Sequence, residues 1–433
     1  CSSDLWKAEY AVLIICSTLV DYFASRKMGA IKEKKKRKKY LWLSLIVNLG
    51  LLFSFKYLNF FGDTAEFFLN KFNIFYDVPE FKALLPVGIS FYTFQTLSYT
   101  IEVYWGKQKP EKHLGIFAVY VSFFPQLVAG PIERFDRLGP QFRIKQVFRY
   151  ENLVNGLRLI LFGLFIKMAI ADNLGIYVDD VYENPLNFNS FNVLTALVFY
   201  SFQIYADFYG YSLIAIGSAL ILGIKIMDNF RTPYMSKNIA EFWSRWHISL
   251  STWFRDYLYI PLGGNRVKIS RWYINILIVF TVSGLWHGAS WTFVLWGALH
   301  GFIYILEKVV NSGLKLSEKS QPGLINMLRI AKNFTLVTFI WLFFRSENLE
   351  QVWNMLSALF GNLTLGDQLH VSSYVWILFA FFILTDILFY NTRFDKWCRT
   401  KPMAVRWIFY AILIFGTLAL SGVENNPFIY FQF

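Results

Sequence analysis

Charged side chains are scarce in this chain. Asp, Glu, Lys and Arg together make up 16% of its 433 residues, whereas apolar residues reach 55% and aromatic residues 20%. Soluble domains carry roughly a quarter charged residues, so this composition argues against an ordinary soluble domain. Several apolar runs approach or exceed the roughly 20 residues that cross a bilayer. The shortage of charge therefore indicates an integral membrane protein.

Cysteine is also scarce, and so are the motifs of cofactor chemistry. Three cysteines lie far apart, so they form no metal-binding spacing and indicate no disulfide framework. The sequence lacks a phosphate-binding P-loop, a dinucleotide-binding glycine fingerprint and a GxSxG nucleophile elbow. No two histidines stand four residues apart. We therefore expect no bound metal and find little support for ATP-driven or redox chemistry. The cysteines are Cys1, Cys16 and Cys398.

Basic residues outnumber acidic ones by 42 to 29, which gives a net charge of +13. They lie mainly in short loops between apolar runs, so they predict membrane topology and contact with anionic lipid, and no nucleic-acid partner. The basic loops at 31–39, 106–113, 225–237 and 266–271 are predicted to be cytoplasmic. The acidic loop at 172–183 has no Lys or Arg and is predicted to face outward.

The apolar runs predict an all-α, polytopic integral membrane protein. We expect one membrane-embedded domain over 1–433, with about ten to eleven transmembrane helices, interfacial and re-entrant elements, and a further membrane helix ahead of Cys1. The run at 272–306 is long enough for two short spans or one long tilted helix. The run at 114–130, with Pro125 and Gly130, predicts a broken or re-entrant element.

The most informative segment is GLWHGASWTFVLWGALHG at 284–301. It places His287 in an apolar stretch, where an ionisable group is expensive and indicates a functional site. Imidazole is suited to moving a proton at neutral pH, although a structural histidine is the alternative. Gly284 and Gly288 leave one helix face bare for the close approach of another backbone. On one continuous helix His300 falls on nearly the opposite face, and we assign it to packing or a polar network.

A second segment is EFWSRWHISLSTWFRDYLYIPLGG at 241–264. It predicts an amphipathic helix with one aromatic stripe, which lies at the membrane interface or dips into the protein. His247 flanks the stripe, so it is either an inward-pointing site residue or an interfacial histidine bonded to a carbonyl or lipid headgroup. Pro261 and two glycines then predict a turn. The stripe consists of Trp243, Trp246, Leu250, Trp253 and Tyr257.

Two other polar features lie within apolar runs. Asp207 is an intramembrane carboxylate, which we expect to pair with a cation or hydroxyl. It either orients a histidine, lines a polar cavity or has a structural hydrogen-bond role. Ser90, Gln95, Ser98 and Glu102 form a polar strip, either a tunnel lining or a ladder of bonds between helices. A buried histidine among hydroxyls and aromatics fits acyl transfer.

These motifs together resemble the membrane-bound O-acyltransferase (MBOAT) family, in its bacterial alginate O-acetylation branch. The resemblance covers about a third of the chain and runs in order along most of it. It rests on LPVGISFYTFQ (85–95), FFPQLVAGPIER (123–134), DFYGYSLIAIG (207–217), NFRTPYMSKNIAEFWSRWHISLSTWFRDYLYIPLGGNR (229–266), GLWHGASWTFVLWGALHG (284–301) and NPFIYFQF (426–433).

The resemblance implies a ring of about eleven membrane helices around a thinned centre, where a cytoplasmic donor meets an extracytoplasmic acceptor. It implies that His287 is catalytic and that His247 is the second active-site residue. It also implies the bacterial inner membrane as location and a periplasmic partner transferase. Tyr209 and Leu213 depart from the serine and aspartate that the family commonly has there, which predicts a shifted acceptor preference.

The function predicted is transfer of an acetyl or other acyl group from a cytoplasmic thioester, such as acetyl-CoA, to hydroxyls of an exported polysaccharide or peptidoglycan. His287 is the expected general base, with His247, an amide or a hydroxyl stabilising the oxyanion and an acyl-His287 intermediate as a variant. The alternative is a transporter of a polysaccharide or of a lipid-linked precursor. Internal inverted repeats in the sequence would favour this alternative. A structural membrane subunit is the third option.

Overall fold

Helices make up the regular structure of the chain. The computed structural model describes residues 10–74, 86, 88–127, 130–313, 323–361, 370–390, 392–421 and 428–429. No β-strand occurs in these ranges, and seven of their helical segments are long and apolar enough to cross a membrane. The all-α, polytopic prediction is confirmed, whereas the number of crossings stays a prediction. Cys1, residue 85 and most of the 426–433 motif lie outside the described residues.

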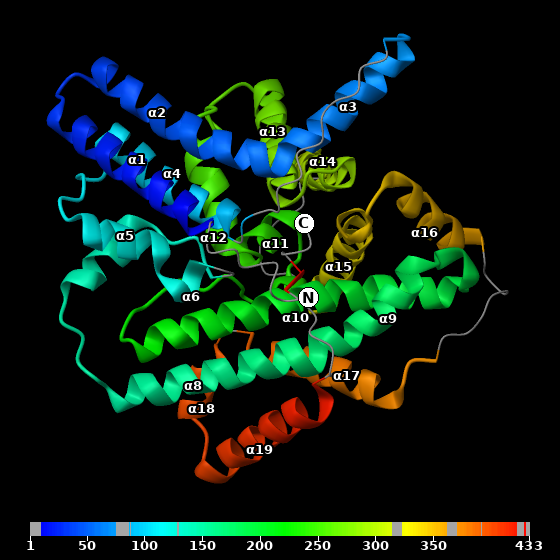
Figure 1. Cartoon of the computed structure of the whole chain (residues 1–433). Helices are drawn as coiled ribbons and strands as arrows, with labels where there is room; N and C mark the ends of the chain where they lie inside the picture. The colour runs from blue at the N-terminus through cyan, green and yellow to red at the C-terminus, as the bar shows by residue number, and fades with distance from the viewer. Residues whose placement is uncertain are drawn as a thin grey trace. The chain divides into compact units, whose positions relative to one another are not determined.

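The chain divides into two units, residues 1–147 with 224–226 and residues 148–223 with 227–433. The prediction of one membrane-embedded domain therefore stays a prediction. The helices of the first unit, labelled in Figure 1, are α1 (Ala11–Ala30), α2 (Lys34–Leu52), α3 (Leu58–Lys71), α4 (Ile89–Trp105), α5 (Leu114–Ser122), α6 (Phe124–Leu127) and α7 (Phe135–Leu138).

Buried polar side chains link the helices of the first unit. Asp21 of α1 accepts hydrogen bonds from Ser44 Oγ at 2.5 Å and from Asn48 Nδ2 at 2.9 Å, both on α2. Gln95 of α4 donates to the carbonyl of Tyr120 on α5 at 2.6 Å. Bonds of this kind keep buried polar groups satisfied, so Gln95 of the polar strip serves helix–helix bonding.

The run at 114–130 is broken, as predicted. Helix α5 ends before Phe123, which has an extended backbone (φ −61°, ψ 105°), and the short α6 follows with Pro125 in its first turn. Proline removes a backbone donor and is incompatible with a continuous helix at this point. Entry and exit on one side of the membrane remain predictions.

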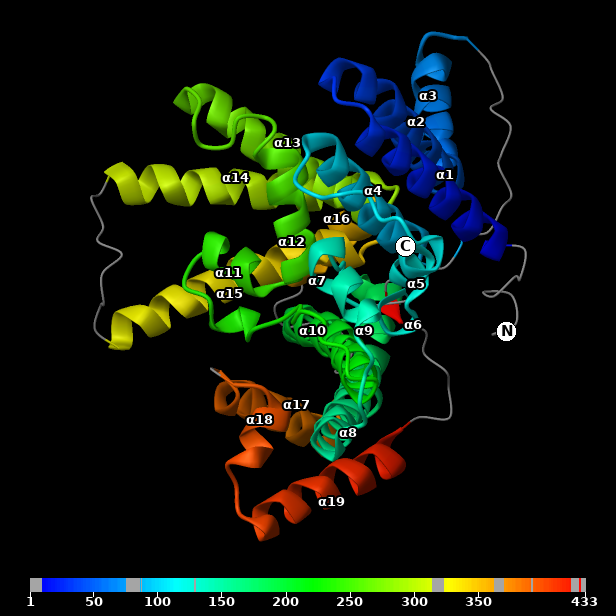
Figure 2. The same cartoon turned by 90° about the vertical axis from the view of Figure 1, so that its left-hand side faces the viewer.

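The second unit contains the remaining helices. Figure 2 shows α13 and α14 lying side by side, and Figure 1 shows α8 beside α10. The helices are α8 (Tyr150–Phe165), α9 (Asp172–Glu183), α10 (Ser190–Ile221), α11 (Ile239–Arg245), α12 (Ile248–Phe254), α13 (Ile269–His287), α14 (Trp291–Gly313), α15 (Gly323–Arg345), α16 (Leu349–Gly361), α17 (Ser373–Leu388), α18 (Phe394–Arg399) and α19 (Met403–Leu420).

Glycines let α8 and α10 approach backbone to backbone. A Cβ at Gly163 would lie 2.6 Å from the carbonyl oxygen of Gly210, and a Cβ at Gly156 would lie 2.6 Å from that of Gly217. Gly156 and Gly163 stand seven residues apart on α8, as do Gly210 and Gly217 on α10. The two glycines of each helix therefore lie along one face of it. Small residues are the usual means of close helix packing in membranes.

An ion pair joins α10 to the π-helical turn Ile166–Ala171 that continues α8. Lys167 Nζ lies 2.7 Å from Asp207 Oδ1 and 2.5 Å from Asp172 Oδ1. Lys167 and Asp207 are buried, so each charge is compensated where water is excluded. The prediction that Asp207 pairs with a cation is confirmed.

We predict that Gly163→Ala lowers the melting temperature of the detergent-purified protein, because the added Cβ meets the Gly210 carbonyl. The expected cost is about 1–3 kcal/mol. Gly50→Ala is the matched control: Gly50 also lies inside a helix, α2, and its Cβ would meet no atom within 4 Å. That control should melt at the wild-type temperature or above it. Equal melting of both variants would refute the close packing.

We predict that Lys167→Met destabilises the protein by about 3–5 kcal/mol, because it leaves two carboxylates near each other without their cation. Adding Asp172→Asn and Asp207→Asn should restore most of the stability, since the amides carry no charge. Melting curves of the single and triple variants in detergent measure both effects. A triple variant as unstable as Lys167→Met would contradict this electrostatic explanation.

Candidate active site

His287 stands at a helix end and is not in the middle of a span. It is the last residue of α13, Gly288 is extended (φ −155°, ψ 151°), and α14 begins at Trp291. Of the two alternatives for 272–306, two helices is therefore the correct one. A Cβ at Gly284 would lie 2.2 Å from the Phe293 carbonyl oxygen, which confirms the predicted close backbone approach.

The predicted single helix over 241–264 is wrong. The chain leaves the helical conformation at Trp246, and His247 adopts left-handed angles (φ 41°, ψ 55°) before α12 begins. Asn229 holds this break: its carbonyl accepts the Ile248 N–H at 2.9 Å, and its Oδ1 accepts the Ser249 N–H at 3.2 Å. These bonds satisfy the first amides of α12, which a new helix leaves without partners. The turn predicted after Pro261 is present, with Gly263 and Gly264 at positive φ.

The two breaks bring His247 and His287 together. Their ring centroids lie 6.4 Å apart, although forty positions separate them in the sequence. His247 is fully buried and His287 is 3% exposed. His247 therefore points inward, which is one of the two alternatives that we derived for it from the sequence.

Aromatic rings from three parts of the second unit enclose the pair. Phe208 of α10 lies 4.7 Å from His247, ring centroid to ring centroid, at 90°. Trp286, Trp296 and Phe344 lie 4.9, 5.0 and 5.3 Å from the His287 ring. Rings in this edge-to-face geometry pack favourably, and they shield the two imidazoles from water.

Burial sets the charge state of His247. It lowers the pKa of this imidazole to about 3, because the charged form loses its hydration. The ring is therefore neutral at pH 7, with one nitrogen as hydrogen-bond donor and the other as acceptor. Nδ1 lies 3.5 Å from Ser249 Oγ, and the tautomer of the ring decides which of these two atoms donates.

His287 occupies a different electrostatic position. The last carbonyls of α13 lie beside it, and a helix C-terminus carries partial negative charge that favours a nearby cation. His287 thus lies beside a partial negative charge at the end of α13, whereas His247 lies at the start of α12.

His300 lies in α14 and is also buried. Its ring centroid is 5.0 Å from that of Trp243 and 5.0 Å from that of Trp296. Trp296 thus separates His300 from His287, because it contacts both rings. These aromatic contacts agree with the packing role that we expected from the sequence.

Asp207 stabilises the segment that packs against the ring next to His247. Its Oδ2 accepts the N–H of Ile429 at 2.9 Å, and the neighbouring Phe428 ring lies 5.6 Å from Phe208. Asp207 thereby ties the described part of the 426–433 motif to the ring that packs on His247. Of the roles considered from the sequence, ion pairing and structural hydrogen bonding are the ones that this geometry shows.

Sequence reasoning missed Asn229 and the enclosing rings. Phe344 comes from α15, far along the chain, and no local pattern marks it. Asn229 lies in the quoted NFRTPY motif, where its polar side chain before an aromatic was an available signal. Among the described residues no group of three His, Cys, Asp or Glu side chains could hold a metal.

Comparison with known proteins relates the chain to one family. The family model of the membrane-bound O-acyltransferase family matches residues 113–346, which include both histidines. The chain is 34% identical to a probable alginate O-acetylase of Azotobacter vinelandii, over 99% of this chain and 92% of that protein. It is 35% identical to a peptidoglycan O-acetyltransferase of Helicobacter pylori, over 99% and 89%. It is 31% identical to a teichoic acid D-alanyltransferase of Bacillus subtilis, over 52% and 59%. The chain therefore belongs to the membrane-bound O-acyltransferase family and is a membrane O-acyltransferase.

Proposed function

We propose that the chain passes an acetyl group from a cytoplasmic thioester, acetyl-CoA or a related donor, toward hydroxyls of an extracytoplasmic polysaccharide. The observation that carries this proposal is the enclosed pair of His247 and His287, with ring centroids 6.4 Å apart. The similarity to an alginate O-acetylase and to a peptidoglycan O-acetyltransferase supports a sugar hydroxyl as the acceptor.

In the proposed reaction His287 is the general base. It takes the proton of the attacking hydroxyl while the oxygen adds to the thioester carbonyl. The tetrahedral intermediate then expels the thiolate, which receives the proton from His287. An ester and a free thiol result, so atoms and charge balance. The α13 C-terminus stabilises the transient imidazolium.

His247 acts on the oxygen of the thioester carbonyl. Its neutral ring donates a hydrogen bond from Nε2 as negative charge develops there, while Ser249 bonds Nδ1. Packing against the Phe208 and Trp286 rings holds the His247 ring in place, so little reorganisation is needed. An acyl-His287 intermediate is an alternative route to the same products.

The location and partner follow from the same proposal. A donor made in the cytoplasm and an acceptor outside require a multi-pass protein of the bacterial inner membrane, in contact with lipid. The seven apolar helices support a multi-pass protein. A periplasmic transferase that completes delivery to the polymer is the proposed partner. The transporter alternative has no comparable observation in its favour, because the matched relatives named here are transferases.

We predict that His287→Ala abolishes transfer, with a loss in kcat of at least about a hundredfold, because the attacking hydroxyl keeps its proton. The measurement is ester-linked acetate on surface polymers of a deletion strain complemented with each variant at matched membrane levels. His300→Gln is the control, since His300 is a buried histidine outside the pair. Wild-type acetate levels in the His287→Ala strain would remove this residue from the chemistry.

We predict that His247→Gln retains more activity than His247→Leu, because glutamine can still donate a hydrogen bond. The loss expected for leucine is about 100–1,000-fold in kcat, the usual effect of removing one oxyanion donor. Initial rates of acetyl transfer in membranes from each strain provide the comparison. Equal rates for the two variants would show that hydrogen-bond donation is not the role of His247.

A further inference from the structure

Two buried arginines lie where α8, α18 and α19 pack together. Helices α18 and α19 both contact α8, and Figure 1 and Figure 2 show the three side by side. Arg158 of α8 is 8% exposed, and Arg406 of α19 has a buried Nε atom. A guanidinium stays charged in proteins. Burying two of them therefore requires anionic or polar groups that compensate the charge.

The two guanidinium groups lie close to each other. Arg158 Nε donates to Tyr410 Oη at 2.7 Å, and Tyr410 stands four residues after Arg406, on the same face of α19. Cys398 of α18 lies near both arginines. Burial raises the pKa of its thiol to about 11, and the positive charges of Arg158 and Arg406 counteract that rise. Two like charges are thus gathered around one buried position.

Neither arginine pairs with a carboxylate within the described part of the chain. The partners of Arg158 are neutral, because besides Tyr410 its Nη1 donates only to Asn155 Oδ1, at 2.9 Å. Arg406 Nε has no hydrogen-bond partner among the described residues. Buried polar atoms are normally hydrogen-bonded, so this position favours the binding of an anion.

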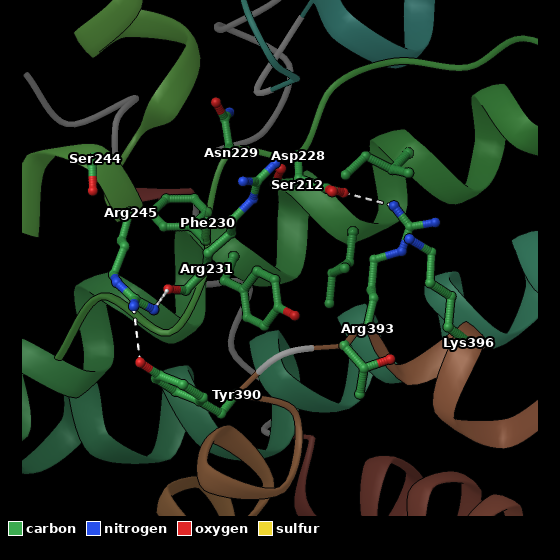
Figure 3. A pocket seen from close by; sticks show the side chains of 14 residues that line it. Ser212, Asp228, Asn229, Phe230, Arg231, Ser244, Arg245, Tyr390, Arg393 and Lys396 are labelled. Atoms are coloured by element: carbon green, nitrogen blue, oxygen red, sulfur yellow. Dashed lines mark hydrogen bonds and ion pairs between the residues drawn. The ribbon is translucent and has the colours of Figure 1, made fainter. Parts of the chain in front are cut away.

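The carboxylates of this region are committed to other arginines. Asp395 is buried in α18 and also acts on the Cys398 thiol, but both of its oxygens accept from Arg393, at 2.7 and 2.9 Å. Arg393 in turn donates to Asp228 at 2.6 Å, as Figure 3 shows.

Glu151, near the start of α8, pairs with Arg399 at 2.7 Å. An anion that binds both Arg158 and Arg406 therefore comes from a separate molecule.

The surroundings of the arginine pair face lipid. Helix α19 is long and apolar enough to cross a membrane, and only 6% of that span is buried in the protein. Arg406 lies in its first turn, next to Trp407, which is 61% exposed. Tryptophan prefers the headgroup level of a bilayer. The exposed apolar residues along α19 are Met403, Trp407, Ile408, Ile412, Ile414, Phe415 and Leu418.

The charge pattern indicates the leaflet. The end of α18 and the start of α19 carry Lys396, Arg399, Lys401 and Arg406, and a cluster of basic residues next to a span predicts the cytoplasmic side. The cytoplasmic leaflet carries negative surface charge from anionic lipids. The anion at hand beside Arg158 and Arg406 is therefore a lipid phosphate.

We propose that Arg158 and Arg406 bind the headgroup phosphate of an anionic phospholipid, such as phosphatidylglycerol, whose acyl chains lie along the exposed apolar side of α19. Guanidinium groups bind phosphate oxygens through paired hydrogen bonds. Tyr410 orients Arg158 for this contact. The bound lipid ties α19 to α8, so it stabilises the folded protein. The site includes neither His247 nor His287 and does not depend on the transfer reaction.

The test is the melting temperature of the full chain, purified in detergent, as a short-chain phospholipid is added. Phosphatidylglycerol should raise the melting temperature of wild type to a plateau. Phosphatidylcholine carries its own compensating cation, and glycerol phosphate lacks the acyl chains. Each of these two should therefore need a concentration at least about tenfold higher for the same shift.

Arg406→Gln should bind phosphatidylglycerol at least about tenfold more weakly, because charged hydrogen bonds to the phosphate are lost. Arg399→Gln is the matched control: it removes the same charge nearby, but the Arg399 side chain is 57% exposed and paired with Glu151. It should respond as wild type does. Melting without added lipid shows whether each variant is folded, and the comparison of the three ligands on wild type needs no variant.

Four results would overturn the proposal. Equal shifts of wild type with phosphatidylglycerol and phosphatidylcholine would show that the negative charge of the lipid is not recognised. An equal response of Arg406→Gln and wild type would exclude the arginine pair. A loss in Arg399→Gln as large as that in Arg406→Gln would reduce the effect to general surface charge. Equal potency of glycerol phosphate would assign the site to a soluble phosphate.

Discussion

The meeting of two buried imidazoles is the interaction on which the site depends. His247 lies at the break between α11 and α12, and His287 is the last residue of α13. The left-handed backbone of His247 ends one helix, and extended Gly288 ends another. Both breaks need outside support, which comes from the side chain and carbonyl of Asn229 and from the bare backbone of Gly284. The geometry of the histidine pair thus results from the interruption of two helices.

Burial sets the charge state of His247. Desolvation keeps His247 neutral at the start of α12, whereas His287 lies beside the C-terminal carbonyls of α13. In the proposed reaction the first ring donates a hydrogen bond and the second accepts a proton within the same aromatic enclosure. The charges of Lys167 and Asp207 are compensated by each other behind this enclosure. Asp207 also accepts the N–H of Ile429, which is adjacent to Phe428, and the Phe428 ring packs on Phe208.

Much of this organisation could be predicted from residue types. The apolar runs indicated an all-helical membrane protein, the burial cost of an ionisable group marked His287 and Asp207, and the glycine spacing indicated close packing at Gly284. The position of His247 could not be derived in this way. Its stripe of aromatics at helical spacing predicted one helix, and only bonds from Asn229 explain why the chain breaks there. The role of Phe344 could not be predicted from the sequence either, because its contact with His287 depends on how α15 packs against the α13–α14 pair.

The central claim is that His247 and His287 act as one unit on one reacting carbonyl. A double-mutant cycle on kcat tests it most directly, using His247→Leu, His287→Ala and the double variant at matched membrane levels. Residues that act as a unit are strongly non-additive, so we expect the double variant to be little slower than His287→Ala alone. Losses that multiply in the double variant would contradict the account, because they would mean that the two histidines contribute independently.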